Sequence, residues 1–213
     1  MKFYIDLEDT RFAYLKEWLE KKYEYVDDMN DAEIIILGIH NMDIPKNTNY
    51  NKVISFNPLN IERNIALNNC ERFLNKNAYL TALGLLKQID LSNKKVVIFG
   101  NGRIATYLAQ EIKEPVTIIC RHPKDNQEPM SSKAYLNADV IINTIPHQLE
   151  LDFNALPKTT KIIDLASKPY GFNHDDLKRK GFDVCLMSGI PGKVFPKEAA
   201  QLIYEEVMEC LED

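Results

Sequence analysis

The sequence predicts an α/β protein with a doubly wound parallel sheet and a small N-terminal α/β domain. Short apolar runs alternate with helical patterns along the chain, which is typical of strand–helix–strand units. One of these runs leads directly into a glycine-rich turn that opens a helical pattern. Several later runs end in polar segments that contain glycine or proline, as expected of strand ends that line a ligand crevice.

The composition is that of an ordinary globular protein. The 213 residues are 45% hydrophobic and 27% charged, and the formal net charge is -5. This length fits one full domain with a small companion. Because the chain has no block of Lys or Arg, we expect neither a nucleic acid nor a membrane surface as partner. A small-molecule substrate is the expected partner.

Targeting and metal-binding patterns are lacking. The first residues do not combine a cationic segment with a long apolar core, and no apolar run approaches the roughly 18 residues of a membrane span. The four cysteines are scattered without a C-x-x-C pair, which favours reduced thiols over disulfides or zinc. The four histidines show no metal-site spacing. We therefore expect a cytoplasmic protein without a metal site.

The small N-terminal domain is expected over residues 1–76. One of its strands is apolar throughout, which predicts a central position in a sheet covered on both faces. A long helical pattern then runs over residues 60–89, without a flexible linker, into the second domain at residues 77–213. The other expected elements are strands at 3–5, 32–38 and 53–56 and a helix at 10–23.

A nucleotide-binding fingerprint opens the second domain. The apolar strand 96–99 leads into the G-x-G-x-x-A sequence at 100–105, and a helical pattern follows. The first glycine permits a tight turn, the second lets a pyrophosphate approach the backbone, and the small third residue lets helix and strand pack closely. A Rossmann-type dinucleotide site is predicted, against the alternative of a purely structural turn. Its cofactor-binding residues are Gly100, Asn101, Gly102, Arg103 and Ile104.

The next strand is expected at 116–120, and the residue that follows it bears on the choice of cofactor. About twenty residues beyond the glycines, an NAD site usually carries Asp or Glu to bind the ribose 2'-hydroxyl. Here the strand ends in Arg121, whose guanidinium can pair with the 2'-phosphate of NADP. We therefore predict NADP, with NAD as the alternative cofactor and a solvated surface arginine as the alternative role of Arg121.

Three later strands and one helix complete the domain. The strands are expected at 138–144, 161–165 and 182–187. In an open parallel sheet their carboxyl ends meet the glycine turn at one crevice. The last helix, 196–211, has an apolar face that indicates a core position or a subunit contact, and a homo-oligomer is expected.

Several segments together resemble the C-terminal domain of the dipicolinate synthase A subunit. The N-T-I-P and D-L-A-S-K-P sequences, in this order and at this distance, are far more specific than the glycine turn. The resemblance extends over roughly residues 77–211. The segments that carry it are 77–84, 100–104, 139–146, 162–169 and 189–197.

The resemblance implies an oxidoreductase-like subunit with a Rossmann fold. Such a protein works with a flavoprotein-like second subunit to make pyridine-2,6-dicarboxylate from a dihydrodipicolinate-type precursor, in spore-forming bacteria. On this reading, the segment of Asn143, Thr144, Ile145 and Pro146 lines the nicotinamide side.

Three residues are candidates for the chemistry. They are Ser167, Lys168 and Lys193. Ser167 and Lys168 would face the substrate, and the two lysines would supply charge for a carboxylate or act in proton transfer. The alternative for each lysine is an exposed, solubilising side chain.

Two departures from the family pattern leave other functions open. Only about seventy-five residues precede the shared helix, so the N-terminal domain is shorter than the family's. The family's Pro-Gly-Gly-x-Asp run is replaced at 169–173, where Tyr170 would fill space that a glycine leaves open. A non-catalytic nucleotide-binding or assembly subunit is therefore the second hypothesis. A small dehydrogenase resembling shikimate or 2-hydroxy acid enzymes is a third, for which the sequence shows no histidine–acid pair.

Overall fold

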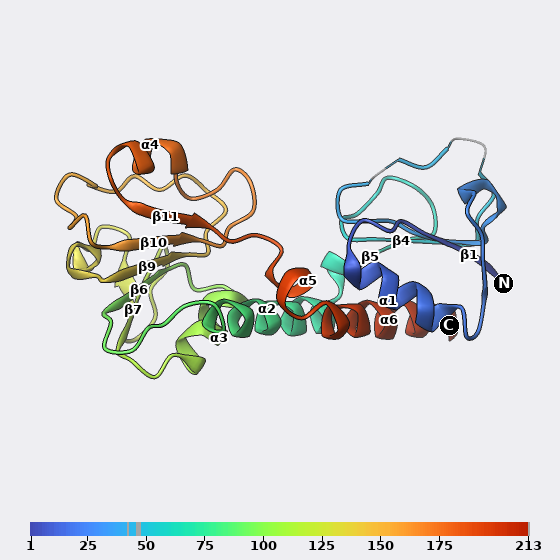
Figure 1. Cartoon of the computed structure of the whole chain (residues 1–213), viewed down its shortest axis with the longest axis horizontal. Helices are drawn as coiled ribbons and strands as arrows, with labels where there is room; N and C mark the ends of the chain where they lie inside the picture. The colour runs from blue at the N-terminus through green and yellow to red at the C-terminus, as the bar shows by residue number, and fades with distance from the viewer. Residues whose placement is uncertain (42, 46–47, 213) are drawn as a thin grey trace. The chain divides into compact units, whose positions relative to one another are not determined.

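The computed structural model describes residues 1–41, 43–45 and 48–212, and the chain forms two compact units. The first unit combines Met1–Leu80 with Pro191–Asp213, and the second unit is Thr81–Ile190. Each unit contains its own parallel β-sheet (Figure 1). The predicted α/β class with a doubly wound parallel sheet is confirmed.

The sheet of the first unit has the strand order β2-β1-β3-β4-β5, and all of its strands are parallel. The three residues of β3 are at most 1% exposed, as expected for a central strand. The strands are β1 (Lys2–Ile5), β2 (Glu24–Tyr25), β3 (Ile34–Ile36), β4 (Lys52–Ser55) and β5 (Asn64–Ala66). The helices are α1 (Thr10–Leu19), α2 (Glu71–Leu86), which also extends into the second unit, α6 (Pro196–Glu212), and the short 3-10 turns η1 (Met29–Asp31) and η2 (Leu67–Asn69).

Helix α6 belongs to the first unit, where it lies beside α1 (Figure 1). The predicted domain 77–213 included this helix, so the observed division differs from the prediction. The physical reason is the apolar face of α6, because Ala200, Ile203 and Val207 share one buried cluster with Phe12 and Leu15 of α1. Packing this face against α1 removes its apolar side chains from water, which stabilises the fold.

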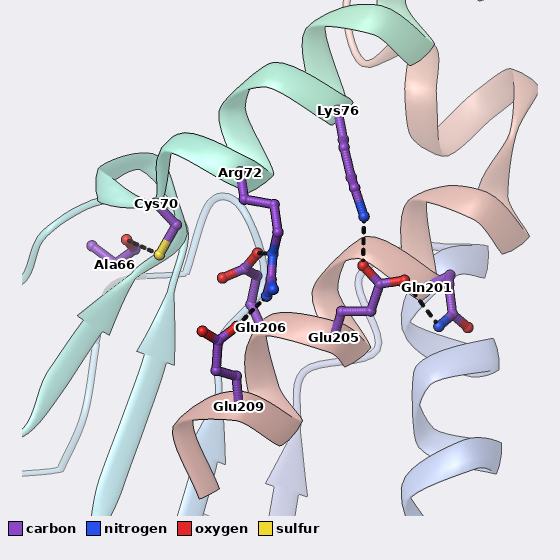
Figure 2. A network of polar contacts seen from close by, with 8 residues as sticks. All are labelled: Ala66, Cys70, Arg72, Lys76, Gln201, Glu205, Glu206 and Glu209. Atoms are coloured by element: carbon purple, nitrogen blue, oxygen red, sulfur yellow. Dashed lines mark hydrogen bonds and ion pairs between the residues drawn. The ribbon is translucent and has the colours of Figure 1, made fainter. Parts of the chain in front are cut away.

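Charged side chains tie α2 to α6 within the first unit (Figure 2). The Nε atom of Arg72 lies 2.7 Å from Oε1 of the buried Glu206, and the same guanidinium also pairs with Glu209. Lys76 donates to Glu205 at 2.8 Å, and this hydrogen bond holds the pKa of Glu205 below its usual value. These contacts join α6 to α2, although the two helices lie more than a hundred residues apart in the sequence.

The start of α2 differs from the predicted helix over 60–89. Residues 64–66 form β5 instead, which pairs with β4 and completes the sheet. The side chain of Asn64 accepts from the backbone of Leu59 and donates to Ser55 Oγ at 2.8 Å. These bonds satisfy the side-chain amide of Asn64, and the pairing of its strand with β4 overrides the helical pattern.

The sheet of the second unit has the order β11-β10-β9-β6-β7-β8, and all of its strands are parallel. Its strand order reverses between β6 and β9, as in doubly wound dinucleotide-binding domains. The strands are β6 (Val96–Phe99), β7 (Val116–Cys120), β8 (Glu128–Pro129), β9 (Val140–Asn143), β10 (Lys161–Asp164) and β11 (Asp183–Leu186). The helices are α3 (Arg103–Glu111), η3 (Ala134–Asn137), α4 (His174–Arg179) and α5 (Ile190–Val194), which begins at the last residue of the unit.

The described part of the chain holds neither a membrane span nor a metal cluster. No helix within it is long and apolar enough to cross a membrane. No group of three or more His, Cys, Asp or Glu side chains within it is arranged to hold a metal ion. All four cysteines are free thiols.

Candidate functional site

A crevice is expected where the strand order of the second unit reverses, between β6 and β9. Gly100 follows β6 and Thr144 follows β9 at the carboxyl ends of these strands. The Thr144 hydroxyl donates to the carbonyl of Phe99 at 2.8 Å, and its backbone N–H donates to the same oxygen at 3.0 Å. The segment after β9 is therefore fixed directly beside the glycine turn.

The two glycines of the turn meet different physical demands. Gly100 has φ +108, and a Cβ there would overlap the Thr144 hydroxyl, so the fold itself requires glycine. At Gly102, by contrast, a Cβ would meet nothing within 4 Å. Packing within the described part of the protein therefore does not explain Gly102, and the fingerprint predicts a glycine here for close approach of a phosphate.

Gly102 is also the N-cap of α3, a helix of nine residues. As glycine, it has no side chain to accept a hydrogen bond from the first turn. The first N–H groups of a helix are partly positive and bind anions. Ala105, the small third position of the fingerprint, is fully buried and lets α3 pack closely on the sheet. The turn and helix thus fit the pyrophosphate of a dinucleotide.

The segment after β7 lies next to this turn. The side-chain amide of Asn101 donates to the carbonyl of His122 at 3.2 Å, so the turn and the segment with Arg121 are joined. Arg121 is exposed, and no acidic side chain of the described residues pairs with it. The guanidinium of Arg121 is therefore an exposed positive charge in the segment joined to the glycine turn.

A buried polar network lies at the ends of β9 and β10. Asp164, which is fully buried, accepts four hydrogen bonds. Oδ1 accepts from Asn143 Nδ2 at 2.8 Å and from the backbone of Ala166 at 3.1 Å. Oδ2 accepts from the backbone of Gly171 at 3.0 Å and lies 2.8 Å from Nε2 of His174. A buried carboxylate needs such partners to offset its desolvation.

The sequence pattern alone did not predict this network. Asn143 was predicted only to line the nicotinamide side, Asp164 was noted only within a strand that carries the resemblance, and no histidine–acid pair was expected. That expectation is wrong, because His174 and Asp164 form such a pair. The available signal was an Asp and an Asn at the ends of two otherwise apolar strands, where polar side chains need partners.

The segment 169–173, which departs from the family pattern, contains a residue in a backbone conformation that is typical of glycine. Tyr170 has φ +64, the left-handed region that favours glycine, and its ring centroid lies 5.2 Å from that of His174. The next residue, Gly171, is buried, and a Cβ there would overlap the side-chain amide of Asn143. Tyr170 therefore covers the histidine, while Gly171 lets the chain pass close to the end of β9.

The three predicted catalytic residues lie in different units. Ser167 and Lys168 follow β10 in the second unit, close in sequence to the Asp164 network, and both are exposed. Lys193 is exposed on α5, in the part of the chain that belongs to the first unit. Ser167 and Lys168 thus belong to the same unit as the glycine turn, and Lys193 belongs to the other unit.

Comparison with known proteins gives one sequence relative and many structural ones. No protein-family model matches the chain. Over 75 residues the chain is 33% identical to the dipicolinate synthase A subunit of Bacillus subtilis (strain 168). The matched segment is 34% of this chain and 25% of that relative, so it spans about a quarter of the relative's length.

The structural matches extend over the whole chain. The dipicolinate synthase A subunit from Bacillus halodurans matches with a TM-score of 0.80 and 19% identity, over 100% of this chain and 98% of that one. An NAD+-bound 3-phosphoglycerate dehydrogenase from Entamoeba histolytica matches with a TM-score of 0.58 and 14% identity, over 99% and 94% of the two chains. The predicted resemblance to the dipicolinate synthase A subunit is confirmed, and the fold is that of NAD-binding dehydrogenases.

Proposed function

We propose, from the resemblance to the dipicolinate synthase A subunit, that this chain is an NADP(H)-binding oxidoreductase subunit that acts on a small carboxylated, dihydrodipicolinate-like substrate. The observation that carries the proposal is the glycine turn, where Gly102 leaves open space at the N-terminus of α3. The sheet order supports it, because the turn and the segment after β9 flank the switch point.

Each part of the crevice has a role in binding the dinucleotide. The turn at 100–104 holds the pyrophosphate through backbone N–H groups, and Arg121 binds the 2'-phosphate. Thr144, Ile145 and Pro146 line the nicotinamide side. When bound, the dinucleotide accepts or donates a hydride, and the protein's part is to orient it against the substrate.

The substrate side of the proposal involves the exposed residues after β10. Lys168 supplies positive charge for a substrate carboxylate, and Ser167 offers a hydroxyl next to it. Lys193 is the corresponding candidate from the first unit. Replacing either lysine with Met tests its role, since unchanged turnover by a folded variant removes that lysine from the mechanism. The resemblance adds a flavoprotein-like second subunit to the proposal, so turnover is to be assayed with and without that partner. The homo-oligomer expected from the sequence stays part of the proposal.

A calorimetric titration with NADPH and NADH tests the cofactor. We expect the wild type to prefer NADPH, and Arg121→Ala to lose that preference by about 10- to 100-fold, the range for hydrogen bonds to a charged group. Lys113→Ala, which removes an exposed charge just after α3, is the matched control and keeps the preference. If the wild type binds neither dinucleotide, the turn is structural and the non-catalytic assembly subunit becomes the better hypothesis.

A dehydrogenase acting on a hydroxy acid is a second candidate. The pair of His174 and Asp164 favours it, because a histidine held by a buried carboxylate can accept the proton that such an oxidation releases. Oxidation of 2-hydroxy acids with NADP+, lost in His174→Gln, would support this candidate over the first.

A further inference from the structure

We propose that Asp164 is a positioning residue for the nicotinamide half of the dinucleotide and acts through Asn143. The inference rests on the proposed function, since it presupposes that the crevice of the second unit binds a dinucleotide. Asp164 is fully buried and therefore touches no ligand itself.

Asn143 clamps the segment that lines the proposed nicotinamide side. Its Nδ2 donates to the carbonyl of Ile145 at 3.0 Å, and its Oδ1 accepts from the N–H of the same residue at 3.0 Å. One side chain thus satisfies both backbone groups of Ile145. The position of Ile145 and its neighbour Thr144 therefore depends on how the amide of Asn143 is turned.

Asp164 determines that orientation. An ionised carboxylate only accepts hydrogen bonds, so the Nδ2 atom of Asn143 must face it, as the 2.8 Å bond to Oδ1 shows. Oδ1 of Asn143 is then directed at the N–H of Ile145. A neutral side chain of the same shape at position 164 offers both a donor and an acceptor, so it allows either orientation of Asn143.

The carboxylate itself has little freedom to move. Its other partners are the backbone N–H groups of Ala166 and Gly171 and the ring of His174, which come from the segments that follow β10. Fully satisfied buried networks of this kind hold one arrangement, because every alternative leaves a polar group without a partner. Asp164 therefore holds the segment after β9 in a fixed position relative to β10.

The test compares two probes, NADPH and 2'-phospho-ADP-ribose, which lacks the nicotinamide. In Asp164→Asn, we expect the Kd for NADPH to rise about 10-fold, the equivalent of about one hydrogen bond. The Kd for 2'-phospho-ADP-ribose should stay within about twofold, because the turn and Arg121 are untouched. A merely structural role of Asp164 would weaken both probes equally.

Gly171→Ala is a second variant that leaves the carboxylate in place. Its Cβ would overlap the amide of Asn143, so it should displace the clamp and give the same selective loss of NADPH affinity. Thr160→Val is the matched control for general destabilisation, since it removes a buried hydrogen bond to Ala138 in the same sheet and should change neither Kd.

The outcomes separate the two proposals. If the wild type binds neither probe, the proposed function fails. If the wild type binds both, and the variants lose both equally or lose neither, the positioning role of Asp164 is wrong. If Asp164→Asn does not fold, Gly171→Ala decides between these results. A selective loss in Thr160→Val as well would also overturn the inference.

Discussion

The two units place a turn and a helix after comparable strands, but the two turns differ in chemistry. Both sheets are parallel. The strand order reverses beside β1 in the first sheet and beside β6 in the second, and each of these strands is the first of its sheet along the chain. β1 leads through an acidic turn into α1, and β6 leads through the glycine turn into α3. Both helices begin where an open α/β sheet ordinarily binds a ligand.

The N-terminus of α1 is capped by a side chain, whereas the N-terminus of α3 is not. In α1, the Asp9 carboxylate accepts from the backbone N–H of Arg11 at 3.0 Å and pairs with its guanidinium. A Cβ at the neighbouring Gly38 would overlap the carboxylate of Glu8. In α3, the cap is Gly102, with open space in front of it. The same topology therefore leaves a helix N-terminus open to an external anion only where the protein does not supply the anion itself.

The largest effect is expected from Gly102→Asp, which gives α3 the kind of cap that α1 has. A carboxylate there occupies and repels the pyrophosphate site, so the Kd for NADPH should rise at least about 100-fold. The free energy of unfolding should be unchanged or slightly higher, because Asp is a good N-cap. Calorimetric titration and thermal unfolding measure the two quantities. Wild-type affinity in this variant would contradict the comparison.

Gly100→Ala should destabilise the second unit by about 2 kcal/mol. The cost has two sources, the φ of +108 and the overlap of the new Cβ with the Thr144 hydroxyl. Gly181→Ala is the matched control, because φ there is +86 but a Cβ would meet nothing within 4 Å. Chemical denaturation measures the free energy of unfolding of both variants. The difference between their two losses isolates the contribution of the overlap. Equal losses would mean that the turn does not pack against the end of β9.

Asp9→Ala should cost the first unit about 1–2 kcal/mol, the range for losing an N-cap. It also leaves Arg11, which is 5% exposed, without its carboxylate partner. The control is Glu17→Ala, which removes an exposed ion pair with Lys21 on the same helix and should change stability by less than about 0.5 kcal/mol. Chemical denaturation measures both, and equal effects would show that Asp9 does not cap α1.

The smallest effect concerns pH. Burial alone would raise the pKa of Asp9, but the hydrogen bonds and charge of Arg11 bring it below the usual value. The resulting stability is present above the unfolded-state pKa of about 4 and is lost as the pH falls through the lower folded-state pKa.

Asp9→Asn isolates this charge, because Asn is an equally good N-cap. Wild type should be the more stable protein at pH 7, and the difference in melting temperature should shrink as the pH falls below about 4. Thermal unfolding across this range measures it. A difference that stays constant with pH would assign the effect to something other than the charge of Asp9.

The second unit was the more predictable part of the fold. Strands β6 and β7 were predicted with their observed bounds, because a short, mainly apolar run bounded by a charged residue on one side and by glycine or proline on the other leaves little ambiguity. The glycine turn was predicted because its two glycines stand in a fixed local pattern. By contrast, β5 was read as helix, since only its pairing with β4 makes residues 64–66 a strand.

The Asp164 network and the position of α6 depend on contacts that local patterns do not encode. Asp164 and His174 are ten residues apart in the chain, and only the path of the segment between them brings the two side chains together. The apolar face of α6 predicted that the helix packs against another part of the protein, but it did not identify that part. Its partner, α1, lies almost 200 residues earlier in the sequence, as the elements' bounds show.

The division of the first unit into two chain segments has a consequence for synthesis. Residues 81–190 leave the ribosome as one continuous stretch, with every strand of their sheet already made. Residues 1–80 precede them, but α1 has no α6 to pack against until residues 191–213 emerge. Domains usually fold in the order in which they are made. In this chain, the part that is translated first is the part whose core is completed last.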